Sequence, residues 1–523
     1  MTQNNLKLLD CTLRDGGYIN DWNWGFQTAR SIIQSLVRAK IDIIEAGFLR
    51  STDTCTPDRT VCNTIEELNH LLPDNTGQTI FSAMAMRSNY DISKLSPYSG
   101  TGIEMIRITA HDYDIAEGME FAKAVKARGY KLSINPINIM GYSDREILWI
   151  VEQVNKIQPY QFSIVDTFGS MKRKDLLRIA SVVHHNLDPA IRLALHLHEN
   201  MSLSYSLAQD FIEQHLNRPV TIDASLMGIG RTPGNLPVEL IADYLNDNEG
   251  KAYEIDCLMD AIGDYISPMR GETQWGYSPS YFLSARFNLH RNYAEHYLKK
   301  GDLTNRDINH ILARFDREKC TAFDPDYADR LYEEYKNNVI DDSQSRSELK
   351  QELQGRDILL LAPGATINTH EREITQYIAL HSPIVISVNF IPGQYHIDYS
   401  FFGNSKRFDY ITSFPGKVIA ASNLSGQEID YRIDYNSLTG DFSYGCNSLL
   451  MVLKLLRDMG VKSIALAGAD GYREGMRNYY DGSIRNYVEH GSSFNEAVVR
   501  AVNNLGISIE FVTPSIYSEI MRA

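Results

Sequence analysis

Two short motifs, far apart along the chain, carry residues that could together bind a metal ion. Arg14-Asp15 follows the apolar run 6–13, and His196-Leu197-His198 follows the apolar run 191–195. Because residues i and i+2 of a strand point to the same face, His196 and His198 can direct two imidazoles at one ion. Asp15 is the natural third ligand, and nitrogen and oxygen donors without thiolates suit a catalytic divalent cation. The alternative is an accidental His pair and an Asp15 that caps a helix.

Length, charge and cysteine usage limit the class of protein. The chain has 523 residues, more than one core usually serves, so we expect two domains. A net charge of -15 argues against a general nucleic-acid surface. The six cysteines form no CxxC motif, and the start lacks a signal-peptide pattern. We therefore expect a cytoplasmic protein without membrane insertion, since no apolar stretch of about 18 residues occurs.

Short apolar runs alternate with longer amphipathic stretches over the first 290 residues. Eight strand–helix units of this kind predict a (β/α)₈ barrel of the TIM type. The expected strands cover 6–9, 41–45, 78–81, 105–108, 131–134, 161–165, 193–196 and 220–223. Helical spacing is seen at 27–40, 117–129, 144–157 and 174–186.

Polar residues then fall at the carboxyl ends of the expected strands, the face on which such barrels carry their active sites. An accidental alignment of this many charged groups with strand ends would be unusual. The residues are Asp15, Glu45, Arg107, Asp166, His196, His198 and Asp223.

The motifs in residues 6 to about 290 resemble a superfamily of metal-dependent aldolases and lyases. Its members include 4-hydroxy-2-oxovalerate aldolase, hydroxymethylglutaryl-CoA lyase and isopropylmalate synthase. The shared pattern is Arg-Asp after the first strand, Glu after the second, HxH after the seventh and a glycine-rich loop after the eighth. Here it reads Asp10-Cys11-Thr12-Leu13-Arg14-Asp15-Gly16, Ile44-Glu45-Ala46-Gly47, His196-Leu197-His198-Glu199-Asn200 and 223–235.

The resemblance implies roles for individual residues. Asp15, His196 and His198 would hold a divalent ion, with Asn235 a further ligand, and Arg14 would lie beside the metal. An ion that chelates a 2-oxo acid polarises its carbonyl and stabilises the enolate formed when a carbon–carbon bond breaks or forms. Glu45 would orient Arg14, although it could equally form an ordinary strand-end ion pair. The ligand types admit Mn, Mg, Co or Zn.

The chain departs from the oxovalerate aldolases near Asp15. Those enzymes carry a catalytic histidine three residues later, where this chain has Tyr18. Tyr18 could replace it as a base only if its pKa, ordinarily about 10, were lowered. Otherwise Tyr18 orients the substrate while water, His111 or a later tyrosine moves the proton. Tyr277 and Tyr281 lie near the position of another catalytic tyrosine of those aldolases, and Tyr281 is the catalytic candidate.

Three further residues are candidates for substrate binding. Arg107 and His111 follow the fourth strand and could recognise a substrate carboxylate. Asp166 follows the sixth strand, where it could support the site or cap a helix. Trp22 and Trp24 could cover the pocket or hold the first loop to the barrel.

Residues 291–350 become helical and charged, and the polar stretch 341–347 indicates an inter-domain linker. Residues 351–523 alternate strands and helices again, which predicts a Rossmann-like α/β domain. The turn after its first strand lacks GxGxxG, so dinucleotide binding is not expected. Faintly, this domain resembles bacterial sialyltransferase-type domains, which implies a nucleotide or phosphorylated sugar near Gly364, Asn389 and Asp470. These residues could also be turn residues of an interaction module.

Three functions for the whole chain remain open. The first is a multifunctional enzyme, an aldolase or lyase on a 2-oxo acid and an aldehyde or sugar-derived partner, fused to a sugar-handling domain of surface-polysaccharide or unusual-sugar metabolism. The second confines chemistry to the barrel and makes the remainder a binding or oligomerisation module. The third is acyl-CoA-dependent condensation. A homo-oligomer, most simply a dimer, is the expected assembly.

Overall fold

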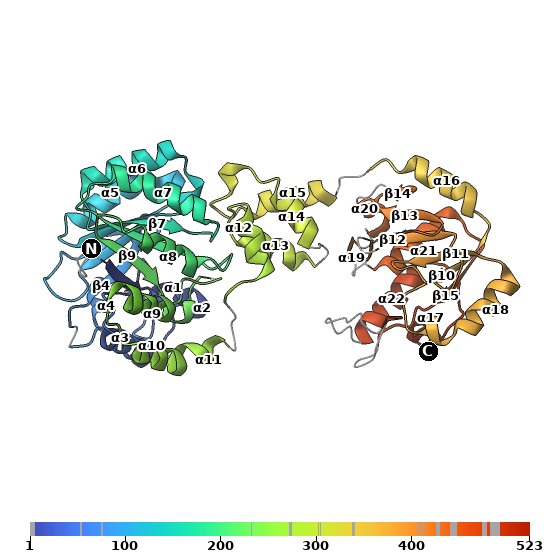
Figure 1. Cartoon of the computed structure of the whole chain (residues 1–523), viewed down its shortest axis with the longest axis horizontal. Coiled ribbons are helices and arrows are strands. Elements are labelled where there is room, and N and C mark those ends of the chain that lie inside the picture. The colour runs from blue at the N-terminus through green and yellow to red at the C-terminus, as the bar shows by residue number, and fades with distance from the viewer. Residues whose placement is uncertain are drawn as a thin grey trace. The chain divides into compact units, whose positions relative to one another are not determined.

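A computed structural model describes the chain from residue 6 to 522, apart from 53–54, 75–76, 232, 271–274, 302, 304, 337–339, 404, 409–410, 412, 425–428, 440–446, 473–478 and 482–491 (Figure 1). Thr232 of the glycine-rich loop therefore lies outside the described residues. The chain divides into two compact units, residues 1–329 and 330–523.

The first unit contains a closed barrel of eight parallel strands surrounded by helices. The order is β1-β9-β8-β7-β6-β5-β4-β2, with a short β3 beside β2, and β1 pairs with β2 to close the barrel. This confirms the fold predicted from the sequence. The strands are β1 (Leu6–Asp10), β2 (Ile43–Leu49), β3 (Val61–Cys62), β4 (Ile80–Met86), β5 (Met105–Ala110), β6 (Lys131–Pro136), β7 (Gln161–Asp166), β8 (Arg192–Leu197) and β9 (Val220–Ala224).

The barrel helices follow the predicted spacing to within a few residues. In α6 (Asp144–Ile157), Ser143 and Glu146 form a reciprocal capping box, and the buried stripe runs from Ile147 to Ile157. Every residue of most barrel strands is buried, because one side faces the interior and the other faces helices. The other helices are α3 (Phe26–Arg38), α4 (Ile65–Asn69), α5 (Ile115–Lys126), α7 (Arg173–Asn186), α8 (Ser204–Glu213) and α9 (Val238–Glu249).

The segment after β1 forms two short helical turns, α1 (Thr12–Asp15) and α2 (Gly17–Asn20), which two tryptophans fasten. The indole of Trp22 donates to the Arg14 carbonyl at 2.7 Å, and that of Trp24 donates to the Leu13 carbonyl at 3.2 Å. A Cβ at Gly17 would lie only 2.0 Å from the Trp22 ring, so the ring needs glycine there. Of the two roles considered for these tryptophans, the structure shows that they hold the loop.

Asp10 is the last residue of β1, and its raised pKa leads us to expect that the stability of the protein depends on pH. Burial raises the pKa of Asp10 to about 7, although hydrogen bonds from Thr12 lower it. The folded protein therefore retains a proton that the unfolded chain releases near its ordinary value of 3.8. Consequently this contribution to stability is complete below the unfolded pKa and is lost as the pH rises towards 7.

We expect Asp10→Asn to be more stable than the wild type by a few kcal/mol at alkaline pH and by much less in acid. Asparagine keeps an acceptor for the Thr12 amide but has no proton to lose. Urea unfolding of chelator-treated protein on either side of neutrality measures the difference. A difference that is the same at both pH values would contradict the assignment.

Beyond the barrel, the first unit continues as a helical extension that packs on barrel loops. Arg317 donates to the Gly141 carbonyl at 2.6 Å, and the Thr321 hydroxyl donates to Asp112 at 3.1 Å. The boundary between the units falls within α15. The helices are α10 (Ile255–Ala261), α11 (Ser267–Arg270), α12 (Pro279–Arg286), α13 (Asn292–Lys300), α14 (Asn305–Leu312) and α15 (Pro325–Lys336).

Residues 343–347 of the polar stretch 341–347, which was predicted to be a linker, lie in a helix. Helix α16 covers Ser343–Leu353 and packs on the second unit through buried Leu349 and Leu353. Arg346 pairs with Asp342 at 2.8 Å, one helical turn earlier. The first turns of α16 are polar, and its two buried leucines come only after them, so the linker role of this stretch stays a prediction.

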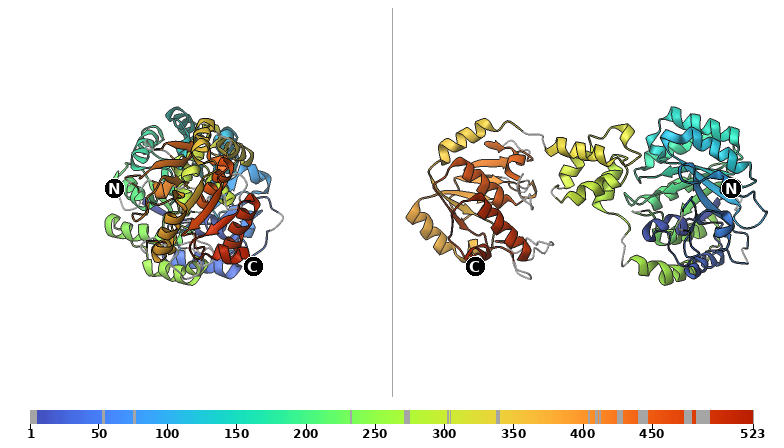
Figure 2. Two further views of the ribbon diagram at one scale, coloured as in Figure 1. Left: turned by 90° about the vertical axis from the view of Figure 1, so that its right-hand side faces the viewer. Right: turned by 180° about the vertical axis from the view of Figure 1, so that it is seen from behind.

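The second unit is a seven-stranded parallel sheet with helices on both faces (Figure 2). Its order is β14-β13-β12-β11-β10-β15-β16, so the strand order reverses between β10 and β15, although these two strands run parallel. This second parallel α/β sheet is as predicted. The strands are β10 (Asp357–Leu361), β11 (Ile384–Val388), β12 (Tyr399–Phe402), β13 (Lys417–Ala421), β14 (Tyr431–Ile433), β15 (Ser463–Ala467) and β16 (Ile509–Phe511). The helices are α17 (Thr366–Thr369), α18 (Glu371–His381), α19 (Ser405–Phe408), α20 (Tyr435–Thr439), α21 (Ser448–Met459), α22 (Ser492–Leu505) and α23 (Ile516–Arg522).

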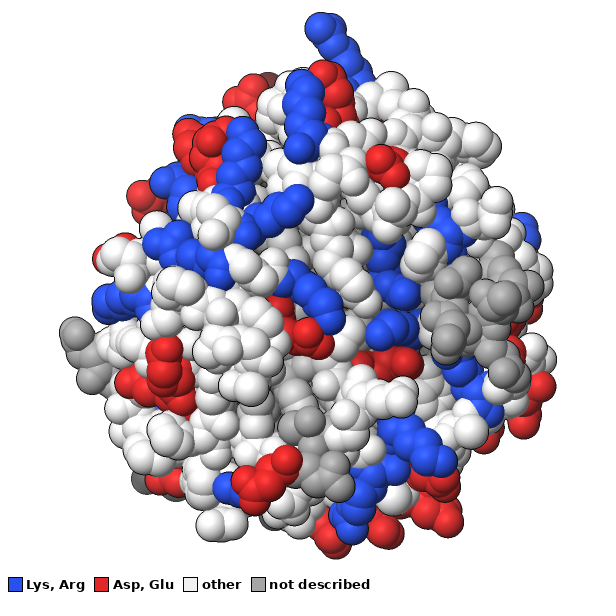
Figure 3. All heavy atoms as spheres, turned by 90° about the vertical axis from the view of Figure 1, so that its left-hand side faces the viewer, with Lys and Arg blue, Asp and Glu red and all other residues white. Residues whose placement is uncertain are grey.

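Acidic and basic side chains are interspersed on the face drawn in Figure 3, without one continuous basic field. In the part of the chain that the structure describes, no helix has the length and apolar character needed to cross a membrane.

Candidate metal centre and substrate pocket

Three predicted ligands from two ends of the barrel sequence meet at the carboxyl ends of the strands. Asp15 comes from the turn after β1, His196 lies on β8, and His198 follows directly after that strand. Both histidine Nε2 atoms lie 3.8 Å from Asp15 Oδ2, and all three side chains are buried. The ligand atoms lie within 4.8 Å of one another, close enough to share one cation.

The second nitrogen of each imidazole is already held by an acceptor. His196 Nδ1 lies 3.2 Å from Asp223 Oδ2, and His198 Nδ1 lies 3.0 Å from the Asp166 carbonyl oxygen. These acceptors favour a proton on Nδ1 and leave the Nε2 lone pairs facing Asp15, the usual arrangement for metal-binding histidines. Among the described atoms Asp15 Oδ2 is buried without a hydrogen-bond partner. A divalent cation would satisfy it, so the donor set fits one.

The charge states also suit a cation. Burial would raise the pKa of Asp15, but Arg14 and the two imidazoles hold it well below its usual value, so the carboxylate is ionised. Burial, assisted by His196, lowers the pKa of His198 to about 3, so this imidazole is neutral. An anionic carboxylate and a neutral imidazole are the forms that bind metals.

Asn235, the expected further ligand, lies against the same carboxylate. Its Nδ2 donates to the Ile229 carbonyl at 3.1 Å, while its Oδ1 is buried without a partner among the described atoms. A Cβ at Gly230 would lie 2.2 Å from Asn235 Nδ2 and 3.2 Å from Asp15 Oδ2. The glycine therefore lets the loop approach the centre closely.

Arg14 lies beside the centre and is oriented by Glu45. Its Nη1 donates to Asp15 Oδ1 at 2.6 Å, and its Nε donates to Glu45 Oε2 at 2.7 Å. Glu45 Oε2 also accepts from Arg107 Nη1 at 3.0 Å. Glu45 is thus shared by two buried arginines and is more than an isolated ion-pair partner at a strand end.

Arg107 differs from the substrate-binding residue expected at this position. It is 1% exposed, and its guanidinium contacts Asp223 and Asn135 as well as Glu45. Because Asp223 in turn holds His196, Arg107 belongs to the network that fixes the centre. This arrangement favours a positioning role over a direct contact with substrate.

The carboxylate and the carbonyl of Asp166 each hold neighbouring groups of the protein in place. Its carboxylate accepts from the Ser170 amide at 2.9 Å and the Met171 amide at 3.1 Å, which holds the loop after β7. Burial raises the pKa of this carboxyl to about 7, although those amides lower it. Its carbonyl orients His198. The carboxylate therefore holds the loop and does not cap α7, whose N-cap is Lys172, and substrate binding by Asp166 stays a prediction.

The three candidate proton carriers differ in their surroundings. Tyr18 is 37% exposed, and the Arg231 guanidinium lies 5.6 Å from its ring centre. His111 has a buried Nδ1 without a partner among the described residues, and burial lowers its pKa despite neighbouring acidic groups. Tyr281, on α12, accepts from the Asn200 side chain through its carbonyl at 3.4 Å.

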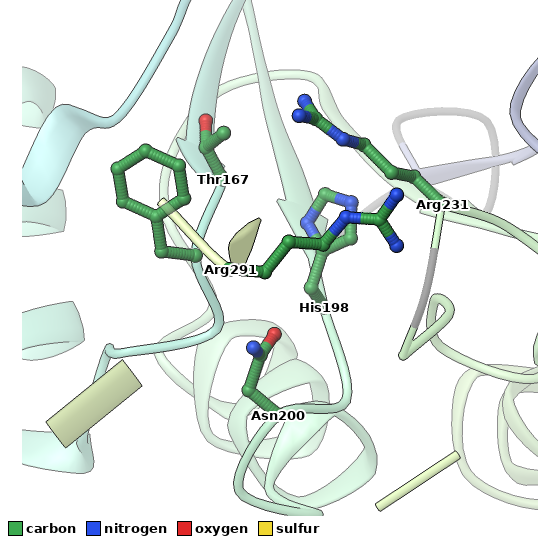
Figure 4. Close-up of a pocket in the computed structure, with 6 residues that line it drawn as sticks. Thr167, His198, Asn200, Arg231 and Arg291 are labelled. Carbon is green, nitrogen blue, oxygen red and sulfur yellow. The ribbon is translucent and has the colours of Figure 1, made fainter. Parts of the chain in front are cut away.

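A pocket opens beside His198 on the barrel side of the helical extension (Figure 4). Arg231 comes from the glycine-rich loop after β9, and Arg291 precedes α13 of the extension. Neither arginine was singled out from the sequence, since the loop motif is recognised by its glycines and the extension carries no motif. The lining residues are Thr167, Phe168, His198, Asn200, Arg231 and Arg291.

The three candidates in the second unit hold turns together. The Asp470 carboxylate accepts from the Thr366 amide at 3.0 Å and also contacts its hydroxyl. A Cβ at Gly364 would lie 2.5 Å from the Asp470 carboxyl carbon, so the two segments are tightly packed. Asn389 has a φ of 60° and accepts from the Gly403 amide at 3.1 Å. Ligand binding by these residues remains a prediction.

Comparison with known proteins agrees with the barrel site. Residues 5–258 match the model of the HMGL-like family. A 4-hydroxy-2-oxovalerate aldolase from Thermomicrobium roseum is 25% identical over 341 residues, 61% of this chain and 89% of that protein. An oxaloacetate decarboxylase from Mycobacterium tuberculosis is 20% identical over 312 residues, 58% of this chain and 89% of that protein.

Solved structures also match about half of this chain. The N-terminal domain of a candidate aldolase from Bacteroides vulgatus has 25% identity and a TM-score of 0.48, covering 56% of this chain and 96% of its own. A hydroxymethylglutaryl-CoA lyase from Pseudomonas aeruginosa has 18% identity and a TM-score of 0.42, covering 52% and 94%. Residues 5–258 are thus similar to the HMGL-like family and to relatives named as an aldolase and a decarboxylase.

Proposed function

We propose that the barrel is a divalent-metal-dependent aldolase or lyase that cleaves a carbon–carbon bond of a 2-oxo acid and releases pyruvate. The observation that carries this proposal is the convergence of Asp15 Oδ2 and two histidine Nε2 atoms, with each Nδ1 held by an acceptor. The aldolase relatives support the same class of substrate.

The bound cation would polarise the 2-oxo carbonyl and stabilise the negative charge that develops on its oxygen. Arg14 adds a permanent positive charge next to the centre, and Glu45 keeps its guanidinium aimed there. Because Arg14 and the three ligands are buried, their charges act with little solvent screening.

For the proton of the 4-hydroxyl group, we favour His111 as the acceptor and assign Tyr18 to orienting the substrate. A neutral imidazole with an unpartnered Nδ1 can accept a proton near neutral pH. We expect His111→Gln to lower kcat by about 10² to 10⁴-fold and Tyr18→Phe by roughly 10-fold. Steady-state cleavage rates with the metal restored measure both. A larger loss for Tyr18→Phe than for His111→Gln would return Tyr18 to the role of base.

The defining experiment is pyruvate release from a panel of 4-hydroxy-2-oxo acids, with oxaloacetate included, after chelation and reconstitution with Mn, Mg, Co or Zn. We expect pyruvate only in reconstituted samples, with the preferred metal identified by the rate. Release of free thiol from an acyl-CoA with a 2-oxo acid would instead indicate condensation. Metal binding without any product from the 2-oxo acids would contradict the proposed substrate class.

For the second unit, we propose binding of a nucleotide or a phosphorylated sugar, which would connect the chain to surface-polysaccharide or unusual-sugar metabolism. Support comes from its topology, since ligands of open parallel sheets bind where the strand order reverses, and Gly364 and Asp470 follow β10 and β15 at that point. Equilibrium dialysis with nucleotide sugars tests the idea. Self-association into a homo-oligomer is a further proposal, tested by sedimentation.

A further inference from the structure

The pocket beside His198 brings two guanidinium groups together. Arg231 and Arg291 both line it, and Figure 4 shows both side chains reaching towards His198. The two arginines come from segments about 60 residues apart, the loop after β9 and the start of α13, so the extension is needed to complete the pocket.

Among the residues that the structure describes, no acidic side chain neutralises the charge of Arg231. Its polar contact is with His290 Nε2 at 2.6 Å, and it also lies over the Tyr18 ring. In the described part of the chain no carboxylate forms an ion pair with Arg231. Burial and the charge of Arg231 lower the pKa of Arg291, although Glu295 opposes this effect. Two partly buried like charges favour an anion between them.

Glu295 is close enough to Arg291 to raise its pKa, whereas three other carboxylates belong to the network around the metal centre. Asp15 and Glu45 are bound by Arg14, and Asp223 is bound by Arg107. The metal centre with Arg14 is sufficient for the single carboxylate of a 2-oxo acid. Arg231, which lines the pocket together with Arg291, therefore has the charge to bind a second anionic group on the same substrate.

Two other residues that line the pocket can form hydrogen bonds with the part of the substrate that leads to this anionic group. The Thr167 hydroxyl accepts from the Asn138 amide at 2.7 Å, which leaves its own proton to donate. Asn200 Oδ1 is buried without a partner among the described atoms and can accept from a substrate hydroxyl.

We propose that Arg231 and Arg291 bind a carboxylate or phosphate at the end of the substrate remote from the 2-oxo acid. This rests on the proposed aldol cleavage. In that reaction the C3–C4 bond breaks and its electron pair passes to the pyruvate half, whose C3 then gains a proton. The 4-hydroxyl loses its proton, and C4 becomes the carbonyl of an aldehyde that carries the anionic group.

The first arm of the test measures binding without turnover. Calorimetry on the metal-loaded protein uses acetate, which has no 2-oxo group, as the carboxylate probe and inorganic phosphate as the phosphate probe. We expect one of them to bind at least about 10-fold more weakly to Arg231→Gln. Arg173→Gln, an exposed arginine that pairs with Asp210 on the outer surface, is the matched control and should bind like the wild type.

The second arm compares kcat/KM for three 4-hydroxy-2-oxo acids that end in a methyl group, a carboxylate or a phosphorylated hydroxymethyl group. We expect an anionic end to be preferred by at least about 10-fold and the preference to shrink in Arg231→Gln and in Arg291→Gln. Probe affinities unchanged by Arg231→Gln, or no preference for an anionic end, would overturn this inference. Loss of probe binding in Arg231→Gln without pyruvate from any substrate would leave the pocket in place and overturn the aldolase proposal alone.

Discussion

Replacing both His196 and His198 with alanine is expected to remove the bound metal and to lower pyruvate formation by more than about a thousandfold. The two Nε2 atoms provide two of the three converging donors, and the remaining carboxylate of Asp15 is paired with Arg14. One carboxylate that already shares its charge with an arginine cannot hold a divalent ion in competition with water. Elemental analysis of purified protein, followed by the pyruvate assay with added metal, measures both effects.

His185→Ala is the control for this prediction. His185 is an exposed histidine on α7 whose ring contacts only its own helix in the contacts described, so its removal should leave metal content and activity unchanged. Circular dichroism must show that the double variant is folded. Retention of a stoichiometric metal ion by the folded double variant would show that the ion binds elsewhere in the chain.

The second large effect is expected from Arg107→Met, which should destabilise the protein by about 3–5 kcal/mol. Arg107 is fully enclosed and pairs with both Glu45 and Asp223. Its removal leaves the buried Asp223 without its arginine and Glu45 with Arg14 alone, and methionine fills the space without restoring the charge. Urea unfolding of the metal-free protein measures the loss independently of catalysis.

Arg107→Lys is the informative companion, because it keeps the charge but cannot span two carboxylates with a planar fork. We expect it to recover part of the stability. A normal stability for Arg107→Met with only a raised KM would restore the role in substrate binding that the sequence suggested. Metal affinity should fall with stability, since Asp223 would lose the partner that keeps it beside His196.

The barrel and the convergence of Asp15, His196 and His198 could be predicted from the sequence because both depend on local rules. A parallel strand buried on both sides is a continuous apolar run, and the residue after it must lie at the catalytic face. HxH on β8 and Asp15 after β1 satisfy these rules without knowledge of any other contact.

Roles that depend on partners from distant segments were not predictable. Arg107 follows the same strand-end rule as the ligands, yet Asp223 and Glu45, from other strands, decide what its side chain does. The arginine pocket requires Arg291 from the extension, whose position is set by packing between helices. The polar start of α16 likewise concealed a helix whose two leucines are buried only against the second unit.

The two tryptophans that hold the loop after β1 also provide a fluorescence signal from this part of the protein. Trp22 and Trp24 are hydrogen-bonded to the carbonyls of residues 14 and 13, directly before the Asp15 ligand, and both rings are buried. Trp275 is also buried and donates to the Met227 carbonyl of the loop after β9, so three of the four tryptophans contact loops that carry residues of the centre. Titration with paramagnetic Co should quench their fluorescence, so occupancy can be followed optically during the very experiments that vary the ligands.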